Sequence, residues 1–337
     1  MKTIDLRSDT VTKPVAEMKQ AMFAAQLGDD VYGEDPSVNM LEKKAALLLG
    51  KEDAIFCSSG TQSNLIALMA HCDRGDEYIV GQDAHTYKYE AGGAAVLGSI
   101  QPQPISFDVD GTLNLDTVKR VIKPDDNHFA KTKLLCLENT IGGKVLPLNY
   151  LNQAKDLVDE YHLSFHLDGA RLFNAVISQG VDVKQITTAF DSISICLSKG
   201  LGAPIGSVLV ASAEIIAKAR RIRKMLGGGM RQAGMLAAAG IYALDNHLHR
   251  LDDDHDNAQL LAQGLSAIEG ITLHGCAQTN MLFLSAQKQP QLIDFLAAKN
   301  IIISNGKVIR LVTHLDINSE DIVKVVTAVE EFYSDNH

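Results

Sequence analysis

The sequence predicts an α/β protein with a mostly parallel sheet covered by helices, followed by a smaller α+β domain. Two observations support this. Short, continuous apolar runs alternate with helical patterns through most of the chain, as expected for strands buried on both faces and joined by crossover helices. After about residue 250 the pattern changes to paired strand signals between helices. We therefore expect an N-terminal arm and large domain over 1–250 and a small C-terminal domain over 251–337.

The elements of the large domain follow in order. Pro14 favours the first turn of a helix over 15–25, a loop covers 28–37, and a helix over 38–49 ends at Gly50. The expected strands are 53–57, 77–81, 133–138, 164–168, 192–198 and 206–212, and the helices among them include 61–72, 149–162 and 171–178.

The second part begins with a long helix expected from Arg231 to about Arg250, followed by the acidic DDDHD and a further helix. Two strand pairs are expected next, 271–276 with 280–285 and 301–305 with 308–314, before a terminal helix over 319–333.

Composition argues against nucleic-acid and membrane partners. The 337 residues carry a net charge of −10, whereas nucleic acids and anionic membranes favour basic surfaces. The chain has no run of about 18 apolar residues that could span a bilayer, and its start resembles no targeting peptide. Its five scattered cysteines form no disulfide or zinc pattern. We expect a cytoplasmic protein without a metal site.

Lys199 lies at the end of an apolar strand, in SKGLGAPIG. A lone lysine there is most often a surface residue. An apolar strand, however, carries its side chain inwards, where a desolvated amine loses its proton more easily. A neutral amine can attack an aldehyde to form a Schiff base. We expect Gly200 and Gly202 to leave room for a bulky cofactor.

Three further segments fit the same cofactor. Asp168, in HLDGAR, ends another expected strand and could make a plain salt bridge, or could hold the nitrogen of a pyridine ring protonated. Ser59, Gly60 and Thr61 precede a helix and could cap it, or could bind a single phosphate at its N-terminus. His85 could be an ordinary loop histidine, or could stack on an aromatic ring.

Together these segments resemble the low-specificity L-threonine aldolases, enzymes of pyridoxal phosphate (PLP) fold type I. The resemblance extends over almost the whole chain, through IDLRSDTVT, GDDVYGEDPSVN, SSGTQSN, AHTYKYEAGGAAVLGSIQPQP, LENT, HLDGAR, LSKGLGAPIGS, GGGMRQAG and RLVTHLD. It implies a large domain with a seven-stranded type of sheet and a homotetramer built as a dimer of dimers. One departure is Ile141-Gly142 after LENT, where a polar pair such as His-Asn is expected.

The resemblance also implies roles for individual residues. Lys199 would bind PLP covalently, Asp168 would pair with its ring nitrogen and His85 would stack on the ring. Ser59, Gly60 and Thr61 would bind the phosphate, with Arg231 of a neighbouring subunit. The substrate carboxylate would be bound by Ser8, Arg171 and Arg310, Arg171 also lining the cofactor site, and His128 would approach the substrate side chain.

The implied reaction is retro-aldol cleavage of L-threonine, L-allo-threonine and other β-hydroxy-α-amino acids to glycine and an aldehyde. Other PLP reactions on this fold are alternatives: β-elimination, transamination and folate-dependent hydroxymethyl transfer. A binding or regulatory protein without turnover is the alternative from another class.

Two remaining clusters invite other interpretations. His247, His249 and His255 lie near four aspartates and could suggest a metal site, but a solvated charged face is the expected interpretation. Gly227, Gly228 and Gly229 could cradle a phosphate but are expected to form a turn that positions Arg231.

Overall fold

The large N-terminal unit is built on a seven-stranded sheet. The computed structural model describes residues 2–334. Across the sheet the strand order is β2-β8-β7-β6-β5-β3-β4. Only β8 runs antiparallel to its neighbours, so the predicted mostly parallel seven-stranded sheet is confirmed. The strands are β2 (Asp53–Cys57), β3 (Asp76–Gly81), β4 (Gln101–Ile105), β5 (Lys131–Glu138), β6 (Ser164–Gly169), β7 (Ser192–Cys196) and β8 (Ser207–Ala211).

Strand β4 was not predicted because its sequence, QPQPI, contains two prolines. A proline cannot donate a hydrogen bond to a neighbouring strand. The structure accommodates Pro102 and Pro104 because β4 is at the edge of the sheet and pairs only with β3.

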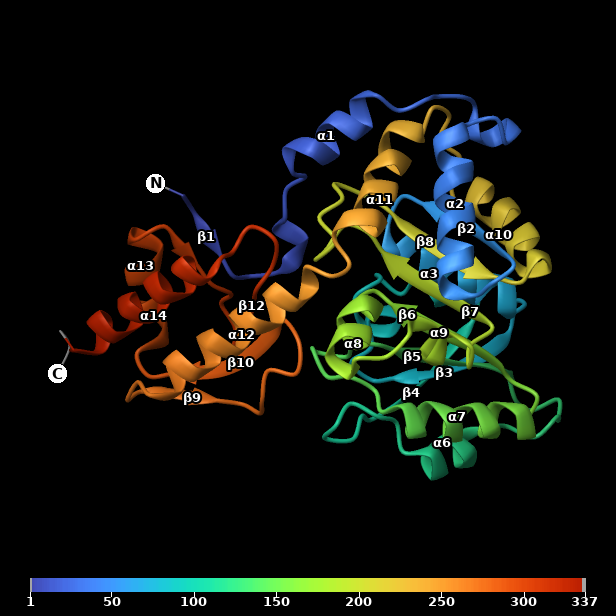
Figure 1. The fold of residues 1–337 in the computed structure, drawn as a ribbon. Helices are drawn as coiled ribbons and strands as arrows, with labels where there is room; N and C mark the ends of the chain where they lie inside the picture. The colour runs from blue at the N-terminus through green and yellow to red at the C-terminus, as the bar shows by residue number, and fades with distance from the viewer. Residues whose placement is uncertain (1, 335–337) are drawn as a thin grey trace.

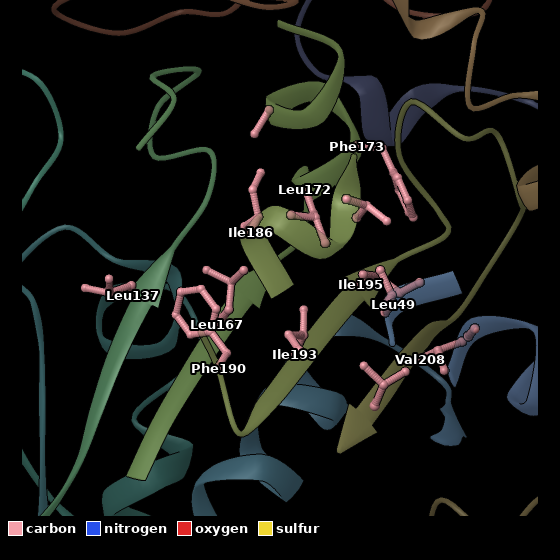
Figure 2. Close-up of a cluster of buried hydrophobic side chains, with 14 of the residues drawn as sticks. Leu49, Leu137, Leu167, Leu172, Phe173, Ile186, Phe190, Ile193, Ile195 and Val208 are labelled. Carbon is pink, nitrogen blue, oxygen red and sulfur yellow. The ribbon is translucent and has the colours of Figure 1, made fainter. Parts of the chain in front are cut away.

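Two apolar layers cover the two faces of the sheet. On one face, side chains of β5 to β8 such as Leu137, Leu167, Ile193 and Val208 pack beneath the helices that carry Leu172 and Ile186 (Figure 2). Helices α2 (Pro36–Leu49), α7 (Leu148–Glu160), α8 (Leu172–Gln179) and α9 (Val183–Thr187) contribute to this layer. Helices α3 (Gly60–His71) and α10 (Ala213–Met225) contribute to the cluster on the opposite face of β2 and β8.

Several predicted helix boundaries shift. The first long helix, α1 (Ala16–Phe23), begins after Val15, so Pro14 is outside it. Helix α2 ends as predicted at Gly50, which adopts φ +67. The helix predicted from Arg231 is wrong at its start: α11 spans Gly234–Asn246. The remaining short helices of this unit are η1 (Asp9–Val11), η2 (Asp30–Tyr32), α4 (His85–Lys88), α5 (Gly93–Val96) and α6 (Leu115–Val121).

The smaller unit contains a three-stranded antiparallel sheet in the order β12-β10-β9. Its strands are β9 (Ile271–Leu273), β10 (Met281–Ala286) and β12 (Ile309–Val312), and its helices are α12 (Leu251–Ser266), α13 (Gln289–Ala298) and α14 (Ser319–Ser334). The predicted pairing of the first two strand segments is confirmed by β9 and β10.

The predicted pairing of 301–305 with 308–314 is wrong. Strand β11 (Ile301–Ile302) instead pairs in parallel with β1 (Ile4–Asp5), while β12 pairs with β10. This arrangement buries Ile4 and Leu6 in the hydrophobic cluster of the small unit, separate from the main cluster of the large one. The N-terminal strand therefore lies against the small unit (Figure 1). The domain boundary near residue 250 stays a proposal.

Among residues 2–334, no helix combines the length and the apolar character that crossing a bilayer requires.

Candidate active site

The carboxyl ends of the parallel strands bring four charged residues to one edge of the large sheet. Glu138 ends β5 and is paired in register with Asp168 of β6. His85 begins α4 shortly after β3, and Lys199 follows β7. Ligands of open α/β sheets bind at such an edge.

Lys199 is partly buried, and its backbone is fixed from two sides. Its carbonyl oxygen accepts hydrogen bonds from Thr12 Oγ1 at 2.9 Å and from the amide of Gly202 at 2.8 Å. The side chain of Lys199 is within electrostatic reach of both His85 and Glu138. Within residues 2–334 its Nζ makes no hydrogen bond or ion pair.

The expectation for Gly200 and Gly202 is wrong. A Cβ atom at Gly200 would lie 2.9 Å from the side chain of Leu251, and one at Gly202 would lie 2.8 Å from Leu315. Protein side chains therefore take the space beside both glycines. Gly202 also adopts φ +75, which favours glycine.

Asp168 is buried and accepts two hydrogen bonds. The side-chain amide of Asn64 donates to its Oδ2 at 2.9 Å, and the backbone amide of Ala170 donates to its Oδ1 at 3.1 Å. Asn64 Nδ2 also donates to Glu90 Oε1 at 2.9 Å. The carboxylate predicted to pair with a ring nitrogen is therefore held at a defined place in the sheet edge.

His85 is oriented by two glutamates. Its Nδ1 lies 2.9 Å from Glu90 Oε1, and its backbone amide donates to Glu138 Oε2 at 2.7 Å. The hydrogen bond with Glu90 raises the pKa of His85. Burial, with the nearby charge of Asp168, raises the pKa of Glu138 to about 7. The site therefore holds two groups, an imidazole and a carboxyl group, that can exchange protons near neutral pH.

The N-terminus of α3 supplies a candidate phosphate site. Ser59 caps the helix by accepting from the amide of Gln62 at 3.1 Å, so its hydroxyl is engaged, while Thr61 is exposed. A Cβ at Gly60 would lie 3.6 Å from Ser207 Oγ. That hydroxyl is buried and has no hydrogen-bond partner among the described residues. Free amide groups and an unsatisfied hydroxyl suit an anion.

Arg171 and Arg310 approach each other from the two units. Arg171 pairs with the fully buried Asp9 through two hydrogen bonds, Nε to Oδ2 at 2.8 Å and Nη2 to Oδ1 at 2.6 Å. Arg310 donates to the carbonyl of Arg7 at 3.0 Å. Burial and the charge of Arg171 lower the pKa of Arg310. Ser8 precedes Asp9 and caps η1, so three predicted carboxylate-binding residues lie in one region.

The structure does not bring His128 or Arg231 into this cluster. His128 lies in an exposed loop, with 80% of its side chain accessible and its Nδ1 2.7 Å from Asp126. Arg231 is half exposed, forms an ion pair with Asp29 at 3.0 Å and lies over the ring of Tyr32. Their predicted roles stay predictions.

The second histidine cluster is engaged in protein contacts. His247 Nδ1 lies 2.7 Å from the carbonyl of Leu201, Asp254 pairs with Arg250, and His255 Nε2 lies 3.2 Å from Asn174. One group among the described residues has the spacing of metal ligands: His85, Glu90 and Asp168. The hydrogen bonds made by Asn64 and His85 account for that spacing without an ion.

Four residues at the candidate site carry no role predicted from the sequence: Asp9, Asn64, Glu90 and Glu138. All four lie in motifs or segments already quoted, namely RSDT, GTQSN, YKYE and LENT. Each of these motifs adjoins the start or the end of a helix or strand that reaches the candidate site. That position in the sequence was the signal from which a role for these four residues could have been predicted. Which side chains point inwards depends on strand register and helix phase.

The family model described as "Beta-eliminating lyase" matches residues 5–287. The low specificity L-threonine aldolase of Escherichia coli (strain K12) is 56% identical over 324 residues, which cover 96% of this chain and 97% of the relative. That of Saccharomyces cerevisiae is 40% identical and covers 98% of this chain and 86% of the relative. The chain belongs to the low-specificity L-threonine aldolase family.

Solved structures of distant sequence share the fold of this family member. A threonine aldolase of Leishmania major superposes with a TM-score of 0.85 at 22% identity, covering 98% of this chain and 99% of that one. A putative L-allo-threonine aldolase of Listeria monocytogenes gives 0.81 at 21% identity, covering 98% and 96%. These likenesses confirm the predicted fold class.

The departure of this aldolase sequence after LENT has a local structural basis. Gly142 and Gly143 adopt φ +55 and +77 and form a two-residue turn, in which Ile141 and Lys144 exchange backbone hydrogen bonds. Positive φ at both central residues favours glycine. Gly142 therefore shapes a tight turn four residues after Glu138.

Proposed function

We propose that this family member binds PLP through Lys199 and cleaves L-threonine, L-allo-threonine and related β-hydroxy-α-amino acids to glycine and an aldehyde. The observation that carries the proposal is the meeting of Lys199, Asp168 and His85 at one sheet edge. Membership of the aldolase family supports a carbon–carbon lyase activity.

The residues at this edge fit the chemistry of PLP. Asp168 offers a buried carboxylate to a protonated ring nitrogen, and His85 offers an aromatic ring. The amide groups that begin α3, with Ser207 Oγ beside Gly60, offer donors to a phosphate. When bound, PLP supplies an electron sink for the pair released when a bond at Cα breaks.

Arg171 and Arg310 would bind the substrate carboxylate. Asp9 occupies the Nε–H and one Nη2–H donor of Arg171, and an arginine has five such donors, so three remain. A carboxylate fixed by two cationic side chains fixes the rotation of the amino acid about its Cα–N bond. That rotation would orient the Cα–Cβ bond so that its electron pair can pass to the electron sink. The arginines would therefore select the reaction as well as the substrate.

Proton transfer would fall to His85 and its neighbours. The β-hydroxyl must lose a proton as the Cα–Cβ bond breaks, and Cα must gain one to give glycine. His85 is held by Glu90, its pKa is raised, and 40% of its side chain is accessible. It can therefore pass a proton to or from a water molecule at the substrate hydroxyl.

The assembly and cell compartment are further parts of the proposal. We propose a homotetramer made as a dimer of dimers, with Arg231 reaching the phosphate of the neighbouring subunit. Exposed apolar side chains near the N-terminal arm, including Phe23, Leu27, Tyr32 and Met40, offer surface for such contacts. We place the enzyme in the cytoplasm.

The test is an assay of purified protein with PLP and L-threonine in the absence of folate. The proposal predicts equal amounts of acetaldehyde and glycine. Release of ammonia and a keto acid would instead indicate β-elimination, the reaction that the matching family description names. Transamination would consume an added keto acid, and hydroxymethyl transfer would require folate. A spectrum unchanged by amino acids would indicate a binding protein.

Lys199→Ala is the matched control for this assay. It should fold but lose the yellow colour of bound PLP and essentially all turnover, because both depend on the amine. Normal colour and activity in this variant would contradict the proposal.

A further inference from the structure

A continuous strip of polar side chains lies buried between α3 and the sheet. Asn64 and His71 are two helical turns apart on α3, and both point at the sheet. On β6, His166 and Asp168 point to the same face, two residues apart. Ser192 of β7 is paired in register with His166. Asn64, His166, Asp168 and Ser192 are almost fully buried.

Hydrogen bonds join these side chains into one chain. His71 Nε2 lies 2.7 Å from Ser192 Oγ, which lies 2.8 Å from His166 Nδ1. His166 Nε2 lies 3.4 Å from Asn64 Oδ1. Asn64 Nδ2 then donates to both Asp168 and Glu90. Glu90 in turn bonds His85, so the chain reaches from His71 to two residues of the candidate active site.

The carboxylates fix the direction of every bond. Asp168 and Glu90 both accept, so the amide nitrogen of Asn64 must face them and its oxygen must face His166. An amide oxygen accepts only, so His166 carries its proton on Nε2 and accepts at Nδ1. The hydroxyl of Ser192 therefore donates to His166 Nδ1.

The two histidines support this arrangement as neutral rings. Burial lowers the pKa of His166 to about 3 and that of His71 to about 4. A neutral imidazole donates from one nitrogen and accepts at the other. Ser192 donates to His166, so its oxygen is left to accept from His71 Nε2. Reversing one bond would place two acceptors or two donors together, at the cost of an unsatisfied buried group.

We propose that Asn64 is a positioning residue that holds Asp168 and, through Glu90, His85 in one arrangement, and that Ser192 and His166 fix the orientation of its amide. The inference rests on the proposed function, in which Asp168 meets the ring nitrogen of PLP and His85 its face. Helix α3 would then contribute to binding at both ends of the cofactor. Its N-terminus would bind the phosphate, and Asn64 would hold Asp168, the partner of the ring nitrogen.

The first experiment needs no substitution in the enzyme observed. Solid-state NMR of the PLP-loaded protein with ¹⁵N-labelled histidine should show His166 protonated on Nε2 and unprotonated on Nδ1, with no titration from pH 6 to 8. The His166→Gln variant identifies its signals. A proton on Nδ1, or titration in that range, would overturn the proposal.

The second experiment measures the dissociation constant of PLP and the pH at which the absorption band of the bound cofactor shifts. Asn64→Leu, which has similar volume but no donors, should weaken PLP binding about tenfold or more, since a hydrogen bond to a charged group is lost. Ser192→Ala should weaken it less, and both should move the spectral pH midpoint.

Ser194→Ala is the matched control. Ser194 is buried on the same strand, but its hydroxyl bonds Ser63, which is not part of the series of hydrogen bonds from His71 to His85. It should match Ser192→Ala in thermal stability without PLP and leave PLP binding and the spectral midpoint unchanged. Equal effects of Ser192→Ala and Ser194→Ala on the midpoint would overturn the proposal, even if Asn64→Leu fails to fold.

Asp168→Ala separates this inference from the proposed function. If Asp168→Ala weakens PLP binding and Asn64→Leu does not, the positioning role is wrong and the cofactor site stands. If neither variant changes PLP binding, the proposed function fails with it.

Discussion

Arg171 and Asp9 form a buried pair joined by two parallel hydrogen bonds, of 2.8 and 2.6 Å. Burial alone would raise the pKa of Asp9, but the charge and hydrogen bonds of Arg171 outweigh it and lower that pKa to about 2. The pair stays ionised at neutral pH. A guanidinium held along one edge has a fixed plane, so Asp9, in the N-terminal arm, sets the orientation of the Arg171 guanidinium.

Asp9→Asn should raise KM for L-threonine about tenfold or more and lower kcat less. The uncharged amide cannot accept both hydrogen bonds, and Arg171 is left free to rotate. Asp5→Asn is the control, because Asp5 also pairs with an arginine, Arg7, but that side chain is half exposed. Steady-state kinetics check the prediction. A lower KM would show that Asp9 competes with the substrate for Arg171 instead of orienting it.

Arg231 should act across a subunit boundary. In its own chain it pairs with Asp29, and its side chain is half exposed, so a neighbouring subunit can reach it. Mixing inactive Lys199→Ala chains with inactive Arg231→Ala chains should restore activity, because one site of each hybrid keeps both groups. Native mass spectrometry would verify that hybrids form. Verified hybrids without activity would place Arg231 outside the site.

The sequence predicted the parts of the site that are attached to strand ends. Lys199 and His85 each follow a buried apolar strand and Asp168 lies at the end of another, and parallel strands present their carboxyl ends together. It did not predict Asn64 or Glu90, because a polar residue inside a helix and an acidic residue in a loop are common without any functional role. Their role depends on the register of β6 with β7 and on which face of α3 is turned towards the sheet.

The long-range pairing of strands also could not be predicted from local sequence patterns. IIISN and VIRLVTH are close in sequence and resemble a hairpin, yet β11 pairs with β1, almost 300 residues away. Burial of the apolar residues Ile4 and Leu6 in the hydrophobic cluster of the small unit favours the pairing of β1 with β11. An N-terminal strand of two residues gives no periodicity to detect.

An ordered water held by His85, His128 or both should take the proton from the β-hydroxyl, so that neither histidine is an indispensable base on its own. Neither single change to Asn or Phe should abolish turnover, while the double change should fall well below both. The solvent-exposed position of His128 predicts that its single change costs less than that of His85. General acid–base catalysis contributes about 10²–10⁴-fold. Loss of activity to the Lys199→Ala level in either single variant would contradict a shared water.

Glu138 should make the stability of the PLP-free protein depend on pH. Burial and Asp168 raise its pKa to about 7, against about 4.3 in an unfolded chain. The folded protein therefore binds more protons than the unfolded chain between these values, and its stability falls as pH rises through this window. At about 1.4 kcal/mol per pKa unit, the loss amounts to at most about 4 kcal/mol.

The Glu138→Gln variant keeps an oxygen that can accept from the amide of His85 but cannot ionise. Its thermal midpoint should equal that of the wild type near pH 4.5 and exceed it increasingly up to about pH 7, with a constant gap above that. Glu160→Gln is the control, since Glu160 is exposed at the end of α7 and pairs with Lys119 in solvent. A constant difference between the two thermal midpoints across the whole range would show that Glu138 is already ionised at pH 5. Proton transfer at the site would then depend on Asp168 and His85 without Glu138.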